Sequence, residues 1–150
     1  MDFLSVLLSR EPAVTVSPQE IFQKYVYAGA LTRNAEALAE LFTEDGVLEA
    51  PLVPADAAFP RRMEGREEIR RALAAYYERQ TSDGGVPNIE KSRYVLHLTD
   101  DPEVFIAEID TVFDGEEDGA DATVSLVQIF RVRDGRIAHL RDYFTPGLVS

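Results

Sequence analysis

The chain has 150 residues, of which 45% are hydrophobic and 28% are charged; this size and composition are typical of one globular domain with its own core. It contains no cysteine, which excludes disulfides and thiolate chemistry, and no run of apolar residues is long enough to cross a membrane as a helix. A formal net charge of −12 repels phosphate backbones and anionic lipid. We therefore expect neither nucleic acid nor a membrane as a partner.

The first residues are predicted to form an arm rather than part of the domain. Residues 1–16 begin with a short apolar stretch that carries Asp2 and is interrupted by Arg10-Glu11. A signal peptide has basic residues at its start and a longer apolar region, so we expect a cytoplasmic protein. The domain itself is predicted to span residues 17–150.

Three helices are predicted in the first half of the domain. Ser17-Pro18-Gln19-Glu20 is a capping box with proline in the first turn. A second helix is expected to begin near Asn34 and to carry Leu38, Leu41 and Phe42 at helical spacing. A third follows Gly65, with an apolar stripe that includes both Tyr76 and Tyr77.

The segment between the second and third helices is predicted to contain a short strand at residues 47–50. It is followed by a loop, residues 51–60, with three prolines and several apolar side chains. We expect this loop to form a flap over a pocket.

The second half of the chain is predicted to be β-structure, with turns at Asp100-Asp101-Pro102 and Asp134-Gly135. The predicted strands are Lys91–Leu98, Glu103–Phe113, Thr123–Val132 and Arg136–Phe144. Helices followed by consecutive antiparallel strands indicate the α+β class. The expected architecture is a cone-shaped roll in which three N-terminal helices pack on a curved, mainly antiparallel sheet.

Two polar residues interrupt otherwise apolar faces of the last two strands. Gln128 is the only polar residue on its face of Thr123–Val132, and Asp142 is the only charged residue on the apolar face of the last strand. A two-residue Asp134-Gly135 loop would place these faces on opposite sides of the sheet, whereas a three-residue loop, Arg133-Asp134-Gly135, aligns them. We therefore predict the three-residue loop, which makes Gln128 and Asp142 diagonal neighbours.

A carboxylate on an apolar face is costly to ionise, so its pKa should rise toward neutrality, as a general acid or base requires. The alternative is that Asp142 accepts structural hydrogen bonds from backbone or arginine. Tyr25 and Gln128 have the same two interpretations, as groups that bond to a ligand or as satisfied core residues. Glu108 and Asp110 share one face of their strand, but both faces of that strand are apolar, so periodicity does not decide which one meets the pocket.

Three stretches of the chain resemble the SnoaL-like, or nuclear-transport-factor-2-like, superfamily. They are residues 41–51 (LFTEDGVLEAP), residues 63–69 (MEGREEI) and residues 128–137 (QIFRVRDGRI) with Asp142-Tyr143-Phe144. The resemblance implies a catalytic aspartate at Asp142, as in polyketide cyclases, and an inward Glu108. It places Ala50 where ketosteroid isomerases have their base, and Ala72 where phenazine-biosynthesis proteins have a histidine.

The resulting hypothesis is a cofactor-independent enzyme, a cyclase, isomerase or dehydratase acting on a hydrophobic cyclic or polyketide-like substrate. Asp142 is the predicted acid/base, and Tyr25 and Gln128 are predicted to hydrogen-bond a carbonyl or enolate oxygen. The predicted substrate-binding residues are Phe22, Phe42, Phe59, Met63, Tyr76, Glu108, Asp110, Phe130, Leu140 and Phe144. No ligand spacing indicates a metal site.

Two other functions fit the same sequence. One is a small-molecule-binding protein without turnover, and the other is an assembly module whose cavity is filled by side chains. A homodimer is expected in either case, because Val127, Ile129 and Tyr143 make the outer face of the sheet apolar.

Overall fold

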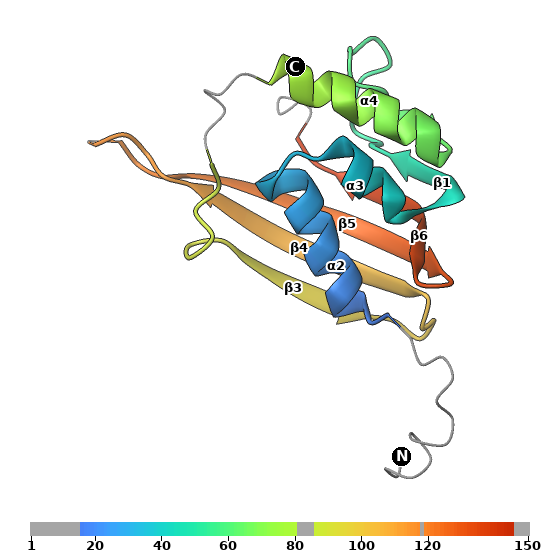
Figure 1. The fold of residues 1–150 in the computed structure, drawn as a ribbon. Helices are drawn as coiled ribbons and strands as arrows, with labels where there is room; N and C mark the ends of the chain where they lie inside the picture. The colour runs from blue at the N-terminus through green and yellow to red at the C-terminus, as the bar shows by residue number, and fades with distance from the viewer. Residues whose placement is uncertain (1–15, 81–85, 118, 146–150) are drawn as a thin grey trace, which may run out of the picture.

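The computed structural model describes residues 16–80, 86–117 and 119–145, so the predicted arm lies outside the described residues except for Val16. Helical segments cover one face of a single six-stranded sheet of order β2-β1-β6-β5-β4-β3 (Figure 1). The helical segments are α2 (Pro18–Val26), the π-helix η1 (Tyr27–Leu31), α3 (Ala35–Glu40) and α4 (Arg66–Arg79). The strands are β1 (Phe42–Glu49), β2 (Arg62–Glu64), β3 (Arg93–Leu98), β4 (Val104–Phe113), β5 (Ala122–Arg133) and β6 (Arg136–Tyr143).

This arrangement confirms the α+β class. All strand pairs are antiparallel except β1 with β6, which is parallel. Within the described ranges, no helix has the length and apolar character needed to span a membrane.

The helix starts follow from local capping signals in the sequence. The Ser17 hydroxyl accepts a hydrogen bond from the Glu20 backbone N–H at 3.2 Å, and the Asn34 side chain accepts one from Ala37 N–H at 2.9 Å. Each cap satisfies a backbone donor that the first helical turn leaves without a partner. The predicted starts of α2 and α3 are therefore correct.

The second helix is shorter than its sequence pattern indicates. It ends at Glu40, and Phe42 begins β1 instead of continuing the helix. β1 runs parallel to β6, with Phe42 opposite Ile137 and Leu48 opposite Leu140. This long-range pairing outweighs the helical spacing of the apolar residues, because Phe42 becomes fully buried against the sheet.

The turn between β5 and β6 has two residues, so the predicted three-residue loop is wrong. Arg133 pairs with Arg136, which leaves Asp134 and Gly135 at the tip. Both tip residues have positive φ, 53° and 77°, as a type I′ turn requires, and this turn matches the twist of the flanking strands.

A β-bulge restores the alignment of the two apolar faces. Val132 pairs with Ile137, but the next pair is Arg131 with His139, so Ala138 is an extra residue in β6. A one-residue shift exchanges the two faces of a strand. With a two-residue loop alone, the apolar faces of β5 and β6 would lie on opposite sides of the sheet. The bulge at Ala138 returns them to the same side.

Beyond the bulge the two strands share one inner face, as predicted, although the register differs. Phe130 lies opposite Leu140, and Gln128 lies directly opposite Asp142 instead of diagonal to it. Direct pairs have closer side chains than diagonal ones. The bulge thus brings the two polar side chains within bonding distance.

Replacing Gly135 with alanine is expected to lower the free energy of unfolding by about 1 kcal/mol. The positive φ disfavours any side chain, and an added Cβ would lie 3.2 Å from Val16 Cγ2. Urea denaturation measures the change, with Gly119→Ala as the matched control because its Cβ would meet nothing closer than 3.5 Å. A loss no larger than that of the control would contradict the assigned turn.

Aromatic rings form the part of the core between α2 and the middle of the sheet. Phe130 stacks on Phe105 with ring centroids 4.6 Å apart, and Phe22 and Tyr25 meet the Phe130 ring edge-on at 6.1 and 5.5 Å. These rings fill the space between α2 and β5, while a cavity of about 370 Å³ lies between α2 and the β3–β4 part of the sheet.

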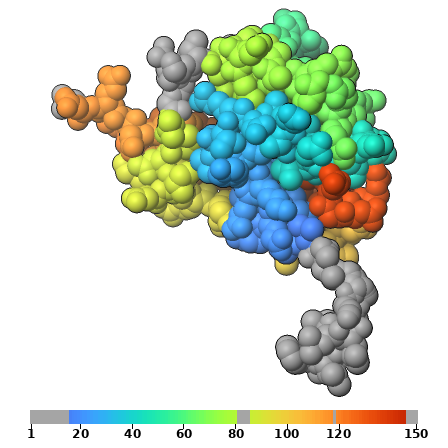
Figure 2. Space-filling view, viewed as in Figure 1, coloured from blue at the N-terminus to red at the C-terminus, as the bar shows by residue number. Residues whose placement is uncertain are grey.

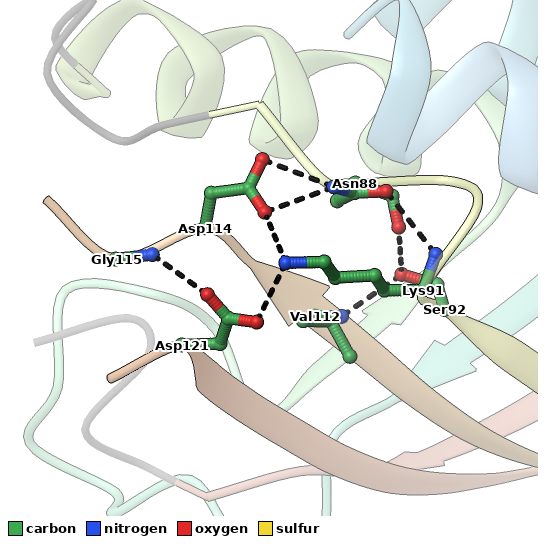
Figure 3. A network of polar contacts seen from close by, with 7 residues as sticks. All are labelled: Asn88, Lys91, Ser92, Val112, Asp114, Gly115 and Asp121. Carbon is green, nitrogen blue, oxygen red and sulfur yellow. Dashed lines mark hydrogen bonds and ion pairs between the residues drawn. The ribbon is translucent and has the colours of Figure 1, made fainter. Parts of the chain in front are cut away.

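The segment before β3 is fastened to the β4–β5 hairpin (Figure 3). Lys91 Nζ lies 3.0 Å from Asp114 Oδ1 and 2.8 Å from Asp121 Oδ2, and Asn88 Nδ2 donates to Asp114 at 2.9 Å. The backbone N–H of Asn88 also donates to the Val112 carbonyl at 2.7 Å. Part of the acidic hairpin loop therefore anchors this segment, which borders the cavities described below.

Candidate active site

A cavity of about 210 Å³ lies between the helices and the inner face of the sheet; we call it the deep chamber. Its walls are mostly apolar and aromatic, as is usual for small-molecule sites. It is lined by Tyr25, Gly29, Ala30, Leu38, Leu48, Ala50, Phe59, Leu73, Tyr76, Tyr77, Leu126, Gln128, Asp142 and Phe144. The three residues predicted to be catalytic all border this one space.

Gln128 and Asp142 form a hydrogen-bonded pair at the chamber. Gln128 Nε2 donates to Asp142 Oδ2 at 3.1 Å. In the described part of the chain, no donor reaches the other oxygen of either group, Asp142 Oδ1 or Gln128 Oε1, although both atoms are buried. Both oxygens are thus buried acceptors without a partner among the described residues, a costly state that is seldom kept for stability alone.

The surroundings of Asp142 make its neutral form unusually stable. Burial raises the pKa of the Asp142 carboxyl to about 7, against a smaller lowering by the Gln128 hydrogen bond. The residue as a whole is half-buried because it borders the chamber, but its Oδ1 atom has almost no accessible surface. Near neutral pH both protonation states are therefore populated, which suits a group that takes up and returns a proton.

Tyr25 reaches the chamber from α2. Burial raises the pKa of its hydroxyl well above the ordinary value, and the charge of Asp142 and then Tyr77 raise it further. A tyrosine that stays protonated can donate a hydrogen bond to a ligand oxygen. Because the Asp142 charge affects this pKa, the two groups lie near each other, and both border the deep chamber.

Tyr77 is a functional candidate that the sequence analysis did not include. It projects from α4, and burial raises its pKa to about 12. A Cβ atom built on Gly29 would lie 3.6 Å from the Tyr77 hydroxyl oxygen, which places that hydroxyl beside the small residues of η1. The apolar stripe that pointed to Tyr76 contains Tyr77 as well, so this signal was present in the sequence. The π-helix had no sequence signal that we recognised.

Some of the predicted substrate-binding residues border the deep chamber. Phe59, Tyr76 and Phe144 line the deep chamber, and Phe59 comes from the loop predicted to be a flap. The other apolar residues of the prediction are buried and do not line this chamber, although Phe22 borders the cavity beside α2: they are Phe22, Phe42, Met63, Phe130 and Leu140. Phe42, Phe130 and Leu140 lie on the inner face of the sheet but at a different height along the strands, where side chains fill the interior.

Glu108 and Asp110 lie on the outer face of the sheet, away from the helices. Glu108 is opposite Val127 and bonds to His97, while Asp110 Oδ1 accepts a hydrogen bond from Ser125 Oγ at 2.6 Å. Their predicted place in the pocket, and the inward Glu108 implied by resemblance, are wrong. The inner face of β4 is occupied instead by Phe105 and Ala107, which are almost fully buried, and strict alternation turns both acids outward.

No cluster of three or more histidine, cysteine, aspartate or glutamate side chains in residues 16–80, 86–117 and 119–145 has the geometry to hold a metal ion.

The fold and the chamber together define a class of protein, namely a small α+β domain whose helices and sheet enclose an apolar pocket with a polar pair on the sheet. The model of the SnoaL-like domain matches residues 22–140 of this chain. The chain therefore belongs to the SnoaL-like family.

Similar proteins agree with this assignment. The chain is 28% identical over 132 residues to the uncharacterised protein YesE of Bacillus subtilis, a match that covers 87% of this chain and 83% of the relative. A solved structure of a candidate isomerase from Bacillus subtilis is 26% identical, with a TM-score of 0.65 over 87% of this chain and 88% of the other. A Catenulispora acidiphila protein with a ketosteroid isomerase-like fold matches with a TM-score of 0.55 at 22% identity, over 89% and 91% of the two chains. The predicted family and fold are thus confirmed.

Proposed function

We propose that this protein is a small-molecule enzyme that performs cofactor-independent acid/base chemistry on a hydrophobic cyclic substrate, as a cyclase, isomerase or dehydratase. The observation that carries the proposal is the buried carboxyl of Asp142, which has one hydrogen-bond donor and a pKa of about 7 inside an apolar chamber. Such a group is costly to maintain for stability alone, and perturbed carboxyls in pockets are typical of catalytic sites.

The proposed reaction begins with a proton next to a substrate carbonyl. The ionised Asp142 removes this proton, and the negative charge moves to the carbonyl oxygen as an enolate. Tyr25 donates a hydrogen bond to that oxygen, where the charge develops. The carboxylic acid then returns the proton to a different atom of the substrate, which completes an isomerisation or supports ring closure or loss of water.

Gln128 would position Asp142 in both protonation states. Its amide N–H₂ donates to the carboxylate, and after rotation its carbonyl oxygen accepts from the carboxylic acid. An amide can therefore follow the proton, which a purely donating partner such as lysine or arginine does not do.

The proposal is tested by hydrogen–deuterium exchange on a model ketone. 1-Tetralone, a bicyclic ketone with an acidic proton beside its carbonyl, is incubated in D₂O with the full chain and followed by NMR. Enzyme-dependent exchange that requires Asp142 supports the proposal. Binding of the ketone with no exchange above the buffer rate would favour a binding protein instead.

We further propose that a second copy of the chain is the partner of the outer sheet face. Val95 and Val127 are 54% and 37% exposed there, and register places Val127 beside Tyr143 in a short apolar strip across β5 and β6. The acids Glu108 and Asp110 lie on the β4 side of this strip. Arg131 and Arg141 lie farther along β5 and β6, so the outer face carries both signs of charge around its apolar residues, and a self-complementary contact between two copies can pair them.

Light scattering at micromolar concentration is expected to give twice the mass of the chain. Val127→Glu should yield a monomer, because it places a charge in the apolar strip beside Glu108. Leu52→Glu is the matched control, since Leu52 is 51% exposed but lies in the loop after β1. A monomeric wild-type protein would contradict this interface.

A further inference from the structure

A second and larger cavity continues the deep chamber toward the end of α4. It has a volume of about 540 Å³, and we call it the outer vestibule. It is lined by Gly29, Ala30, Arg33, Tyr76, Tyr77, Gln80, Pro87, Thr111, Phe113, Val124 and Leu126. Five of these residues also line the deep chamber, namely Gly29, Ala30, Tyr76, Tyr77 and Leu126. The two cavities therefore meet at these residues, which we call the neck.

The neck contains a glycine that backbone packing does not require. A Cβ atom on Gly29 would lie 3.6 Å from the Tyr77 hydroxyl oxygen and 3.8 Å from Leu38 Cδ1, which is ordinary van der Waals contact. Glycine nevertheless costs helix stability relative to alanine. An alanine would therefore fit at this position in contact with Tyr77 and Leu38, so no clash requires the glycine, which borders both cavities. The π-helical turn that carries Gly29 is a local form often found at functional sites.

The volume of the deep chamber limits what it can enclose. A cavity of roughly 150 Å³ is large enough for benzene, so the 210 Å³ chamber has room for one ring or two fused rings. A larger substrate must extend through the neck. The vestibule beyond it is mainly apolar, with Phe113, Val124 and Leu126 on the strand side.

Hydrogen bonds and ion pairs hold both walls of the vestibule in place. Pro87 belongs to the segment that Lys91 and Asn88 tie to the β4–β5 hairpin (Figure 3). In the space-filling view this segment, in yellow, meets the blue surface of α2 and η1 (Figure 2). On the other side, Gln80 Nε2 donates to the Tyr76 hydroxyl at 2.8 Å and fixes the end of α4. Both walls are therefore preformed, which reduces the entropy lost on binding.

We propose that the site takes a two-part ligand, with a one- or two-ring carbonyl head in the deep chamber and an apolar tail that extends past the neck into the outer vestibule. The placement of the carbonyl at Asp142 rests on the proposed function, whereas the path of the tail rests on the neck and the vestibule. The substrate class is accordingly a tailed cyclic ketone or a related cyclic carbonyl compound, with the tail on the ring edge opposite the carbonyl.

The experiment compares 1-tetralone with 6-hexyl-1-tetralone, which carries a six-carbon tail on the edge opposite the carbonyl. Dissociation constants are measured by isothermal titration calorimetry on the full chain. In the wild type the tailed ketone is expected to bind at least about tenfold more tightly, since each buried methylene contributes up to about fourfold in affinity. In Gly29→Val this ratio should fall to within about twofold, because the side chain narrows the passage, and Gly29→Ala should lie between.

Gly119→Ala is the matched control, because it adds the same methyl group in the β4–β5 hairpin without a close contact and should keep the wild-type ratio. Circular dichroism verifies that each variant is folded. If Gly29→Val does not fold, the affinity ratio of the two ketones in Gly29→Ala provides the test. An equal affinity of the two ketones in the wild type, or an unchanged ratio in the Gly29 variants, would overturn the two-part ligand. Loss of enzyme-dependent exchange with the affinity ratio intact would overturn only the acid/base function, and no binding of either ketone would count against both.

Discussion

Asp142→Asn is expected to lower the rate of enzyme-dependent deuterium exchange of 1-tetralone by at least about 10²-fold, the usual contribution of a general base. Asparagine has almost the same shape as aspartate and can still accept the hydrogen bond from Gln128 Nε2. It cannot take up a proton at neutral pH, however. The fold and the chamber should therefore persist while turnover is lost, as measured by NMR exchange rates alongside circular dichroism.

The control for this experiment is Asp110→Asn, which makes the same chemical change on the outer face, where Asp110 bonds to Ser125. This variant should exchange at the wild-type rate. If Asp142→Asn kept the wild-type exchange rate, the buried carboxyl would not be the base, and the mechanism proposed for the chamber would have to be abandoned.

The second expected result concerns stability and pH. The folded-state pKa of Asp142 is raised from 3.8 to about 7, so the folded protein holds a proton in a range where the unfolded chain has released it. The favourable contribution of the neutral form is complete below pH 3.8 and is lost as pH rises toward 7. Above that pH the ionised carboxylate lowers the free energy of unfolding by up to about 4 kcal/mol relative to acid.

Asp142→Asn removes this titration and should therefore be more stable than the wild type at pH 8. Its advantage is expected to grow by about 2 kcal/mol between pH 5.5 and pH 8. Urea denaturation at several pH values measures the free energy of unfolding of both proteins. Taking the difference between the two proteins removes the pH effect of the net charge of −12, which they largely share. Parallel stability curves for the two proteins would show that the Asp142 carboxyl is solvated.

Local signals in the sequence were sufficient for much of the fold. Ser17 and Asn34 locate the starts of two helices because capping depends on residues only three positions apart. The alternation of apolar residues identifies the last four strands, and the combined order of elements indicates the α+β class. The same alternation singled out Asp142 and Gln128, since a polar residue on an apolar face stands out without knowledge of the partner strand.

Features that depend on distant parts of the chain were not predictable in this way. Phe42 belongs to a strand because β6, about a hundred residues later, pairs with it, and β2 is too short to have a periodicity of its own. The bulge at Ala138 changes the partner of Asp142, although either hairpin is compatible with the sequence of the turn. Which face of β4 carries the acids was settled by the helices that cover Phe105 and Ala107.

The residue types of the pocket were predictable from the sequence, whereas its shape depended on the tertiary structure. The residue types of the site were readable from the chain, because the cost of placing a carboxyl, an amide and a tyrosine among apolar neighbours is local. The shape of the space was not, since a cavity is the volume that packed side chains from different elements leave unfilled. Only the packing of η1 and α4 over the sheet decided that Phe130 is core, that Tyr77 borders the chamber, and that Gly29 lies between two cavities.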